Sequence, residues 1–110
     1  MAEEERAQPI FSSFAEDPEL GEAIDAFAFA LAERVDHLQD AEGAGELELL
    51  ANRARSLAED ARAVGFESLA RLAELVNRAA LEAKPEDLHV YLLDLTETAC
   101  RIRLGHRGAL

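Results

Sequence analysis

Residues 46–64, which read ELELLANRARSLAEDARAV, decide the fold of this chain. Apolar side chains recur in this stretch at spacings of three and four residues, which is the pattern of one buried helix face. They are Leu47, Leu50, Ala54, Leu57, Ala61 and Val64. A polar column lies well away from that face and is expected to meet water; it comprises Glu48, Asn52, Arg55, Glu59 and Arg62. Gly65 follows and suits the left-handed residue after a helix end.

The same helical pattern recurs on both sides of this stretch. Together the patterns predict helices over residues 18–40, 46–64, 67–83 and 85–104. Asp17 and Pro18 suit an N-cap and a first helical residue. The Gly-Ala-Gly of residues 43–45 is expected to end the first helix and turn the chain back. Four amphipathic helices with short connections predict an all-α, antiparallel (up-down-up-down) four-helix bundle.

The length of 110 residues predicts a single domain with a modest core. We expect a frayed or disordered N-terminus over residues 1–8, a bundle over 9–104 and a tail over 105–110. A short helical lead-in over residues 9–14 is expected to lie over one end of the bundle.

The net charge of −12 argues against nucleic acid and anionic membranes as partners, because both need a basic patch. The longest run of consecutive apolar residues, residues 26–32, is far too short to span a membrane. The N-terminal Met-Ala-Glu-Glu-Glu-Arg has the wrong charge for a secretory signal. The single cysteine, Cys100, has no partner for an internal disulfide and lies in an apolar register. These features predict a cytoplasmic protein.

Residues 54–66, ARSLAEDARAVGF, resemble the signature helix of histidine-containing phosphotransfer (HPt) domains. That family writes the segment roughly as A-H-x-L-K-G-[SA]-[SA]-x-x-[FLVY]-G-[FA]. Its apolar and glycine positions are matched by Ala54, Leu57, Ala61, Val64, Gly65 and Phe66. Its reactive positions are not matched. Arg55 occupies the position of the phosphorylated histidine, Ala58 that of the lysine and Glu59 that of the glycine.

Flanking segments extend the resemblance over about residues 9–104. PIFSSFAEDPEL, ending at Leu20, is similar to I-x-S-x-F-A-D-D-P-E-M of a bacterial HPt subgroup. FALAERVDHL, which begins at Phe29, is similar to F-x-x-x-L-P-x-R-V-x-x-L. The ACRIR run around Cys100 resembles L-C-R-R-x-R. In this order and spacing, the matches imply the HPt fold.

The resemblance implies a phosphotransfer scaffold without phosphotransfer chemistry. An active HPt histidine takes a phosphoryl group from a receiver-domain aspartate, because one imidazole nitrogen is nucleophilic at neutral pH. The guanidinium of Arg55 stays protonated and offers no lone pair. We therefore expect a protein of two-component phosphorelay signalling that cannot accept phosphate and binds the receiver domain of a response regulator or a histidine kinase. The expected docking face comprises Asn52, Arg55, Ser56, Ala58, Glu59 and Arg62.

Two interpretations of Arg55 remain open. Its cation enters the acidic pocket of a receiver domain, or it forms an ordinary surface ion pair with Glu59, which also lies near Arg62. The ion pair is the simpler interpretation and is favoured, since such pairs are common and individually weak.

Other chemistry has little support in the sequence. The remaining candidates for a phosphoryl acceptor are His37, His89 and His106, and none precedes the Leu-Lys-Gly of the family signature. There is no His-x-x-x-His and no second cysteine, so no metal site is expected. We predict no enzyme activity and no cofactor.

Two alternatives to the signalling hypothesis remain. One is a helical interaction module without a phosphorelay role, which forms a homodimer through Phe29 together with Val90 or Leu93. The other is an enzyme in which a side chain on another face, such as His37, has taken over the chemistry. A monomer is favoured over the homodimer.

Overall fold

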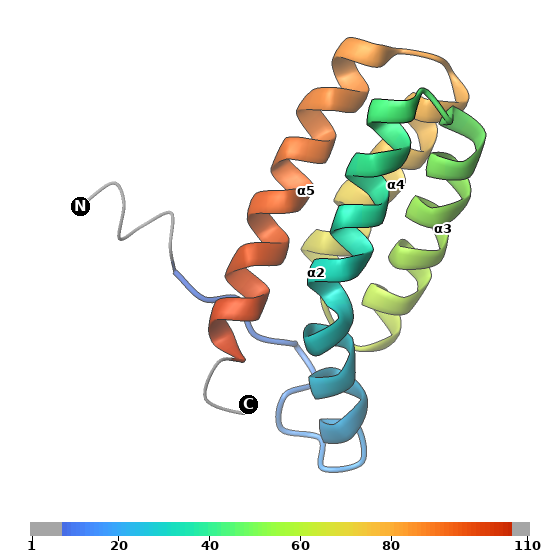
Figure 1. Cartoon of the computed structure of the whole chain (residues 1–110). Coiled ribbons are helices and arrows are strands. Elements are labelled where there is room, and N and C mark those ends of the chain that lie inside the picture. The colour runs from blue at the N-terminus through green and yellow to red at the C-terminus, as the bar shows by residue number, and fades with distance from the viewer. Residues whose placement is uncertain (1–7, 107–110) are drawn as a thin grey trace.

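Four helices make up most of the computed structural model, which describes residues 8–106. Helix α2 spans Gly21–Ala44, α3 spans Leu47–Ala63, α4 spans Glu67–Leu81 and α5 spans Pro85–Gly105 (Figure 1). No strand occurs within residues 8–106. In Figure 1 the chain rises through α2, descends through α3, rises through α4 and descends through α5. Within the described residues, the prediction of an all-helical fold with four helices is confirmed.

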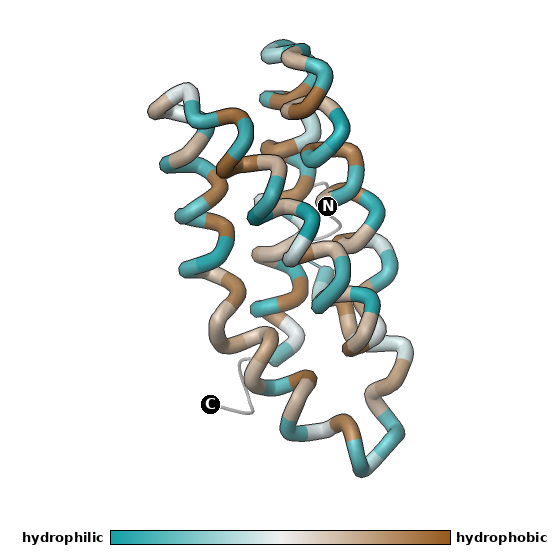
Figure 2. Tube along the Cα trace, turned by 90° about the vertical axis from the view of Figure 1, so that its right-hand side faces the viewer, coloured by the Kyte–Doolittle hydropathy of each residue, from teal (hydrophilic) through white to brown (hydrophobic). Residues whose placement is uncertain are grey.

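One apolar core lies between the four helices. Each helix packs against two neighbours: α3 lies against α2 and α4, and α5 lies against the same two. Apolar and polar segments alternate along each helix, as amphipathic helices require (Figure 2). The largest fully buried side chains are Phe66, Leu31, Leu38, Leu50, Leu57, Leu69, Leu88, Leu95, Ile102 and Val76. Burying each contributes about 1.5–3 kcal/mol relative to exposure.

The apolar face predicted for the central helix is confirmed. Leu50, Ala54, Leu57 and Ala61 are at most 1% exposed, and Val64 is also buried, whereas Leu47 at the start of the helix is only half-buried. Gly65 follows α3 with φ of 86°, which is the left-handed conformation expected of it. The aromatic ring of Phe66 stacks on that of Phe27 in α2, with ring centroids 5.7 Å apart.

Helix α2 begins and ends later than the sequence predicted. It starts at Gly21, and residues 18–20 form a turn. The Asp17 carboxylate still accepts a hydrogen bond from the backbone N–H of Glu19 at 2.9 Å, as a cap would. At the other end, Gly43 is helical and only Gly45 is left-handed, with φ of 73°. A helix tolerates an interior glycine at a cost of about 1 kcal/mol, so the break needs only the second glycine.

Residues 8–20, which include the predicted lead-in, form a loop with turns at 13–16 and 18–20. This loop crosses the end of the bundle where α3 meets α4. The Ser12 hydroxyl donates to the carbonyl of Val64, and the backbone N–H of Ser13 donates to the carbonyl of Gly65 at 2.9 Å. Ile10 donates its backbone N–H to α5. The loop is therefore fastened to α5 and to the α3–α4 connection.

The C-terminal helix differs from the prediction in two details. It extends to Gly105, so the expected tail begins one residue later. Cys100 is exposed, whereas the sequence placed it in an apolar register. The buried side of α5 runs through Leu95, Ala99 and Ile102, and Cys100 lies about 100° around the helix from Ala99. Residues 1–7 and 107–110, where most of the frayed terminus and tail was expected, lie outside the described residues.

No helix within residues 8–106 combines the length and the apolar character needed to cross a membrane.

Candidate functional site

Arg55 lies on the outer side of α3, as the polar column predicted. Its side chain is 74% exposed, and its Nε atom lies 3.8 Å from Oε2 of Glu59, one turn later. That distance is at the outer limit of an ion pair, and the Glu59 side chain is 70% exposed. Such a pair is weak in water, so the guanidinium is free to meet an acidic group of a partner.

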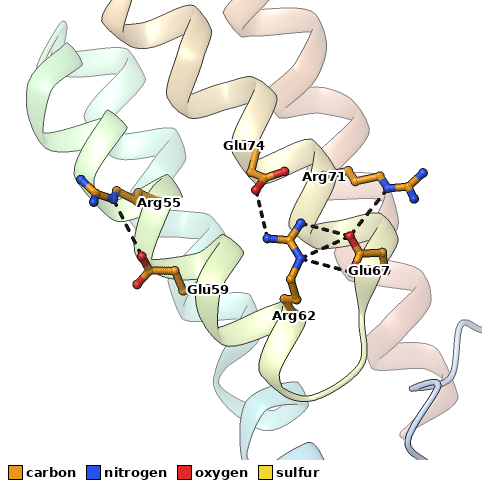
Figure 3. Close-up of polar contacts among 6 residues, drawn as sticks. All are labelled: Arg55, Glu59, Arg62, Glu67, Arg71 and Glu74. Atoms are coloured by element: carbon orange, nitrogen blue, oxygen red, sulfur yellow. Dashed lines mark hydrogen bonds and ion pairs between the residues drawn. The ribbon is translucent and has the colours of Figure 1, made fainter.

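Arg62 belongs to the same polar column but has a different environment. The sequence suggested a contact with Glu59, whereas the structure turns Arg62 toward α4 (Figure 3). Its Nη2 atom lies 3.0 Å from Glu67 and its Nη1 atom 3.0 Å from Glu74. Arg71 adds a longer contact to Glu67, at 3.7 Å.

This network shifts the ionisation of its members. Hydrogen bonds to Glu67 first, and then to Glu74, raise the pKa of Arg62. The hydrogen bond from Arg62 lowers the pKa of Glu67 and that of Glu74 below 4.5. All three groups stay charged near neutral pH. Arg62 therefore holds α3 to the start of α4, and it is less available to a partner than Arg55.

A shallow depression of about 460 Å³ lies beside Arg55, between α3 and α4. The residues that line it are Arg55, Ala58, Glu59, Arg62, Glu74, Asn77 and Arg78. Ala58 is only 3% exposed, so it contributes to the base of this depression and not to an open face. The reason is that α3 packs against two helices, which buries a wider arc than the single seam. Asn77 fixes this region by donating a hydrogen bond to the carbonyl of Ala51 at 2.7 Å.

The other side of the expected face is open and borders α2. Asn52 and Ser56 are exposed. Arg34 of α2 donates to the Ser56 hydroxyl at 3.3 Å and to the Asp60 carboxylate at 2.8 Å. The sequence held no signal for Arg34 and Asp60, because each looks like an ordinary polar residue on its own helix.

The three histidines occupy separate surroundings. His37 on α2 lies 3.9 Å from Glu33, a long contact. His89 on α5 lies 3.0 Å from Glu42 of α2. His106 is half-buried, and its ring packs edge-on against Phe66 with centroids 5.9 Å apart. Within residues 8–106, no three His, Cys, Asp or Glu side chains converge where a metal ion would bind.

The outer side of α3 presents charged side chains around Arg55 that a partner could contact. At position 55 the helix presents a permanent cation beside the carboxylate of Glu59. The residues that line the depression next to Arg55 include no histidine. Comparison with protein-family models, with curated proteins and with solved structures found no match. The interpretation of this face therefore depends on the residues and contacts of the chain itself.

Proposed function

We propose that this protein is an HPt-like docking protein of two-component phosphorelay signalling. It binds the receiver domain of a response regulator, or a histidine kinase, through the outer side of α3 and does not accept phosphate. The observation that carries the proposal is the placement of Arg55. Its guanidinium is exposed and loosely paired, on a helix whose buried Ala54, Leu57 and Ala61 match apolar positions of the HPt signature.

The proposed interaction is electrostatic at its centre. A receiver domain presents acidic side chains around its phosphorylation site, and a guanidinium forms two parallel hydrogen bonds with a carboxylate. Arg55 occupies the position at which an active HPt domain presents its histidine. It would therefore enter the receiver as a fixed cation, and the adjoining α3–α4 depression leaves room for the receiver surface.

We take the protein to share the helix arrangement and the cellular setting of HPt domains. The four helices are taken as the antiparallel, up-down-up-down bundle of HPt domains. The protein acts in the cytoplasm, where receiver domains and kinase catalytic domains lie. It is a monomer that covers its partner's acidic site instead of exchanging phosphate with it.

A binding assay with charge reversal tests the docking face. Purified receiver domains from the source organism are titrated with the full chain by isothermal titration calorimetry. We expect at least one receiver to bind and Arg55→Glu to weaken that binding about tenfold or more. Arg103→Glu on α5 makes the same charge change on an exposed residue outside this face and should leave binding intact. If both variants bind alike, the proposed face is wrong.

A labelling assay tests the absence of phosphotransfer. Incubation with a radiolabelled phosphoreceiver should leave no acid-labile label on this chain, and label on any histidine would contradict the proposal. The triple variant Arg55→His, Ala58→Lys, Glu59→Gly restores the three reactive positions of the signature. Label that appears only in this variant would support a surviving docking surface.

Exposed apolar side chains favour a second candidate, a homodimeric interaction module. Phe29 is 73% exposed on α2, and Val90 and Leu93 are more than half exposed on α5. Light scattering coupled to size-exclusion chromatography distinguishes the candidates. A dimer that Phe29→Glu converts to a monomer would favour this second function, whereas a monomer at high concentration would exclude it.

A further inference from the structure

A second depression lies on the other side of α3, where it meets α2. It has a volume of about 140 Å³ and is lined by Arg34, His37, Leu38, Arg53, Ser56 and Leu57. None of these six residues is acidic, although the whole chain carries a net charge of −12. The volume is well below the ~300–1,000 Å³ of sites for larger ligands, so a small group fits it best.

Arg34 is held in place at this depression before any ligand arrives. One nitrogen donates to Asp60 at 2.8 Å, and another donates to Ser56 at 3.3 Å. Its side chain is 28% exposed, and the guanidinium carbon lies 6.0 Å from the ring centre of Phe27. A guanidinium has five N–H groups, so donors remain for a ligand. Less side-chain entropy is lost on binding when the group is already ordered.

The other polar groups at the depression are also donors without strong acceptors. The Ser56 hydroxyl accepts from Arg34, and within residues 8–106 its own proton has no hydrogen-bond acceptor. Arg53 is exposed and forms no ion pair within those residues. His37 makes only the 3.9 Å contact to Glu33, and an imidazole carries at least one N–H in either protonation state.

We infer that this depression, termed the α2–α3 donor cluster (Arg34, His37, Arg53 and Ser56), binds a single phosphate group. Phosphate suits it because a tetrahedral anion has several acceptor oxygens, and guanidinium groups pair with it through parallel hydrogen bonds. Asp60 neutralises part of the charge of Arg34, and so the second guanidinium, from Arg53, is essential. The inference stands independently of the proposed docking role of Arg55.

The surrounding acids restrict where the anion lies. His37 and Arg53 also line a neighbouring depression whose wall includes Asp40 and Glu46. Those carboxylates repel an anion at that end. The phosphate is therefore expected beside Ser56 and Arg34, within reach of Arg53. More distant acids are screened beyond about 8–10 Å at physiological salt.

Nuclear magnetic resonance of the full chain tests this inference. The ¹⁵N-labelled protein is titrated with sodium phosphate, and separately with sodium chloride at the same ionic strength. We expect saturable shifts at the amide and side-chain signals of the α2–α3 donor cluster with phosphate only. Arg53→Gln should raise the dissociation constant about tenfold, the loss expected from one charge-assisted interaction. Arg103→Gln is the matched control and should bind as the wild type does.

Further arms identify the source of the phosphate group. A phosphoserine peptide and its unphosphorylated form are titrated in the same way. Tighter binding of the phosphopeptide than of inorganic phosphate indicates a phosphorylated protein as the natural ligand, and the reverse order indicates the free anion. Shifts that do not saturate, or that are equal in Arg53→Gln and the wild type, would overturn the inference. Neither result would bear on receiver binding, which Arg55→Glu tests.

Discussion

Replacing Gly65 with alanine should destabilise the fold more than the same change at any other turn glycine. Gly65 has φ of 86°, and an added Cβ would collide with the hydroxyl oxygens of Ser12 and Ser13 and approach the ring of Phe14. The side chains of Ser12, Ser13 and Phe14 would have to move away from the α3–α4 connection. That movement breaks the hydrogen bonds from Ser12 to Val64 and from Ser13 to Gly65.

The expected magnitude has two parts. Alanine in the left-handed region costs about 1–2 kcal/mol, of which about 0.4–1 kcal/mol is recovered from the stiffer unfolded chain. Loss of two of the loop hydrogen bonds adds about 1–3 kcal/mol. Gly65→Ala should therefore lower the free energy of unfolding by about 1–4.5 kcal/mol, compared with the 5–15 kcal/mol typical of a domain.

Two other glycines separate these parts. Gly45 has φ of 73° but nothing within 4 Å of an added Cβ, so Gly45→Ala should lose only the conformational part, about 1 kcal/mol. Gly43 is helical with the same open surroundings, so Gly43→Ala should stabilise by about 0.5–1 kcal/mol. Urea unfolding followed by circular dichroism measures all three. If Gly65→Ala costs no more than Gly45→Ala, the loop does not clamp the bundle as described.

Two further predictions concern the ion pairs of helix α4 and the turn that follows it. Because Arg62 lowers the pKa of Glu67 and Glu74, its stabilising effect is present above their ordinary value of 4.5 and is lost as pH falls through the lowered values. Arg62→Gln should lower Tm at pH 7, and the difference from wild type should vanish in strong acid; a difference that persists there would contradict the ionic origin. Ala83→Gly should raise stability by about 0.5–1 kcal/mol in thermal unfolding, because Ala83 has φ of 53°. A lower Tm would show that this strain is absent.

The sequence determined the helices and the buried side of each. Leu50, Leu57 and Ala61 recur at helical spacing, and this pattern alone placed them in the core. The left-handed conformation of Gly65 could also be predicted from the sequence, because glycine lacks the Cβ that opposes positive φ. By contrast, the left-handed Ala83 had no signal in the sequence, and helix α4 ends at Leu81, before the predicted residue.

For the candidate site, the sequence placed Arg55 on the surface but could not choose partners across helices. Glu59 and Arg62 lie three residues apart on one helix, yet Arg62 pairs with Glu67 and Glu74. The choice depends on how α3 and α4 lie against each other. The separation of residues along one helix holds no information about that arrangement.

The same reason applies to the α2–α3 donor cluster and to the buried Ala58. Periodicity fixes the direction of a side chain relative to its own helix axis, and it was sufficient to show what faces inward. Only the packing of helices decides how wide the buried arc becomes and which polar groups meet. That is why Arg34 and Ser56, 22 residues apart in the chain, form a contact that the sequence did not reveal.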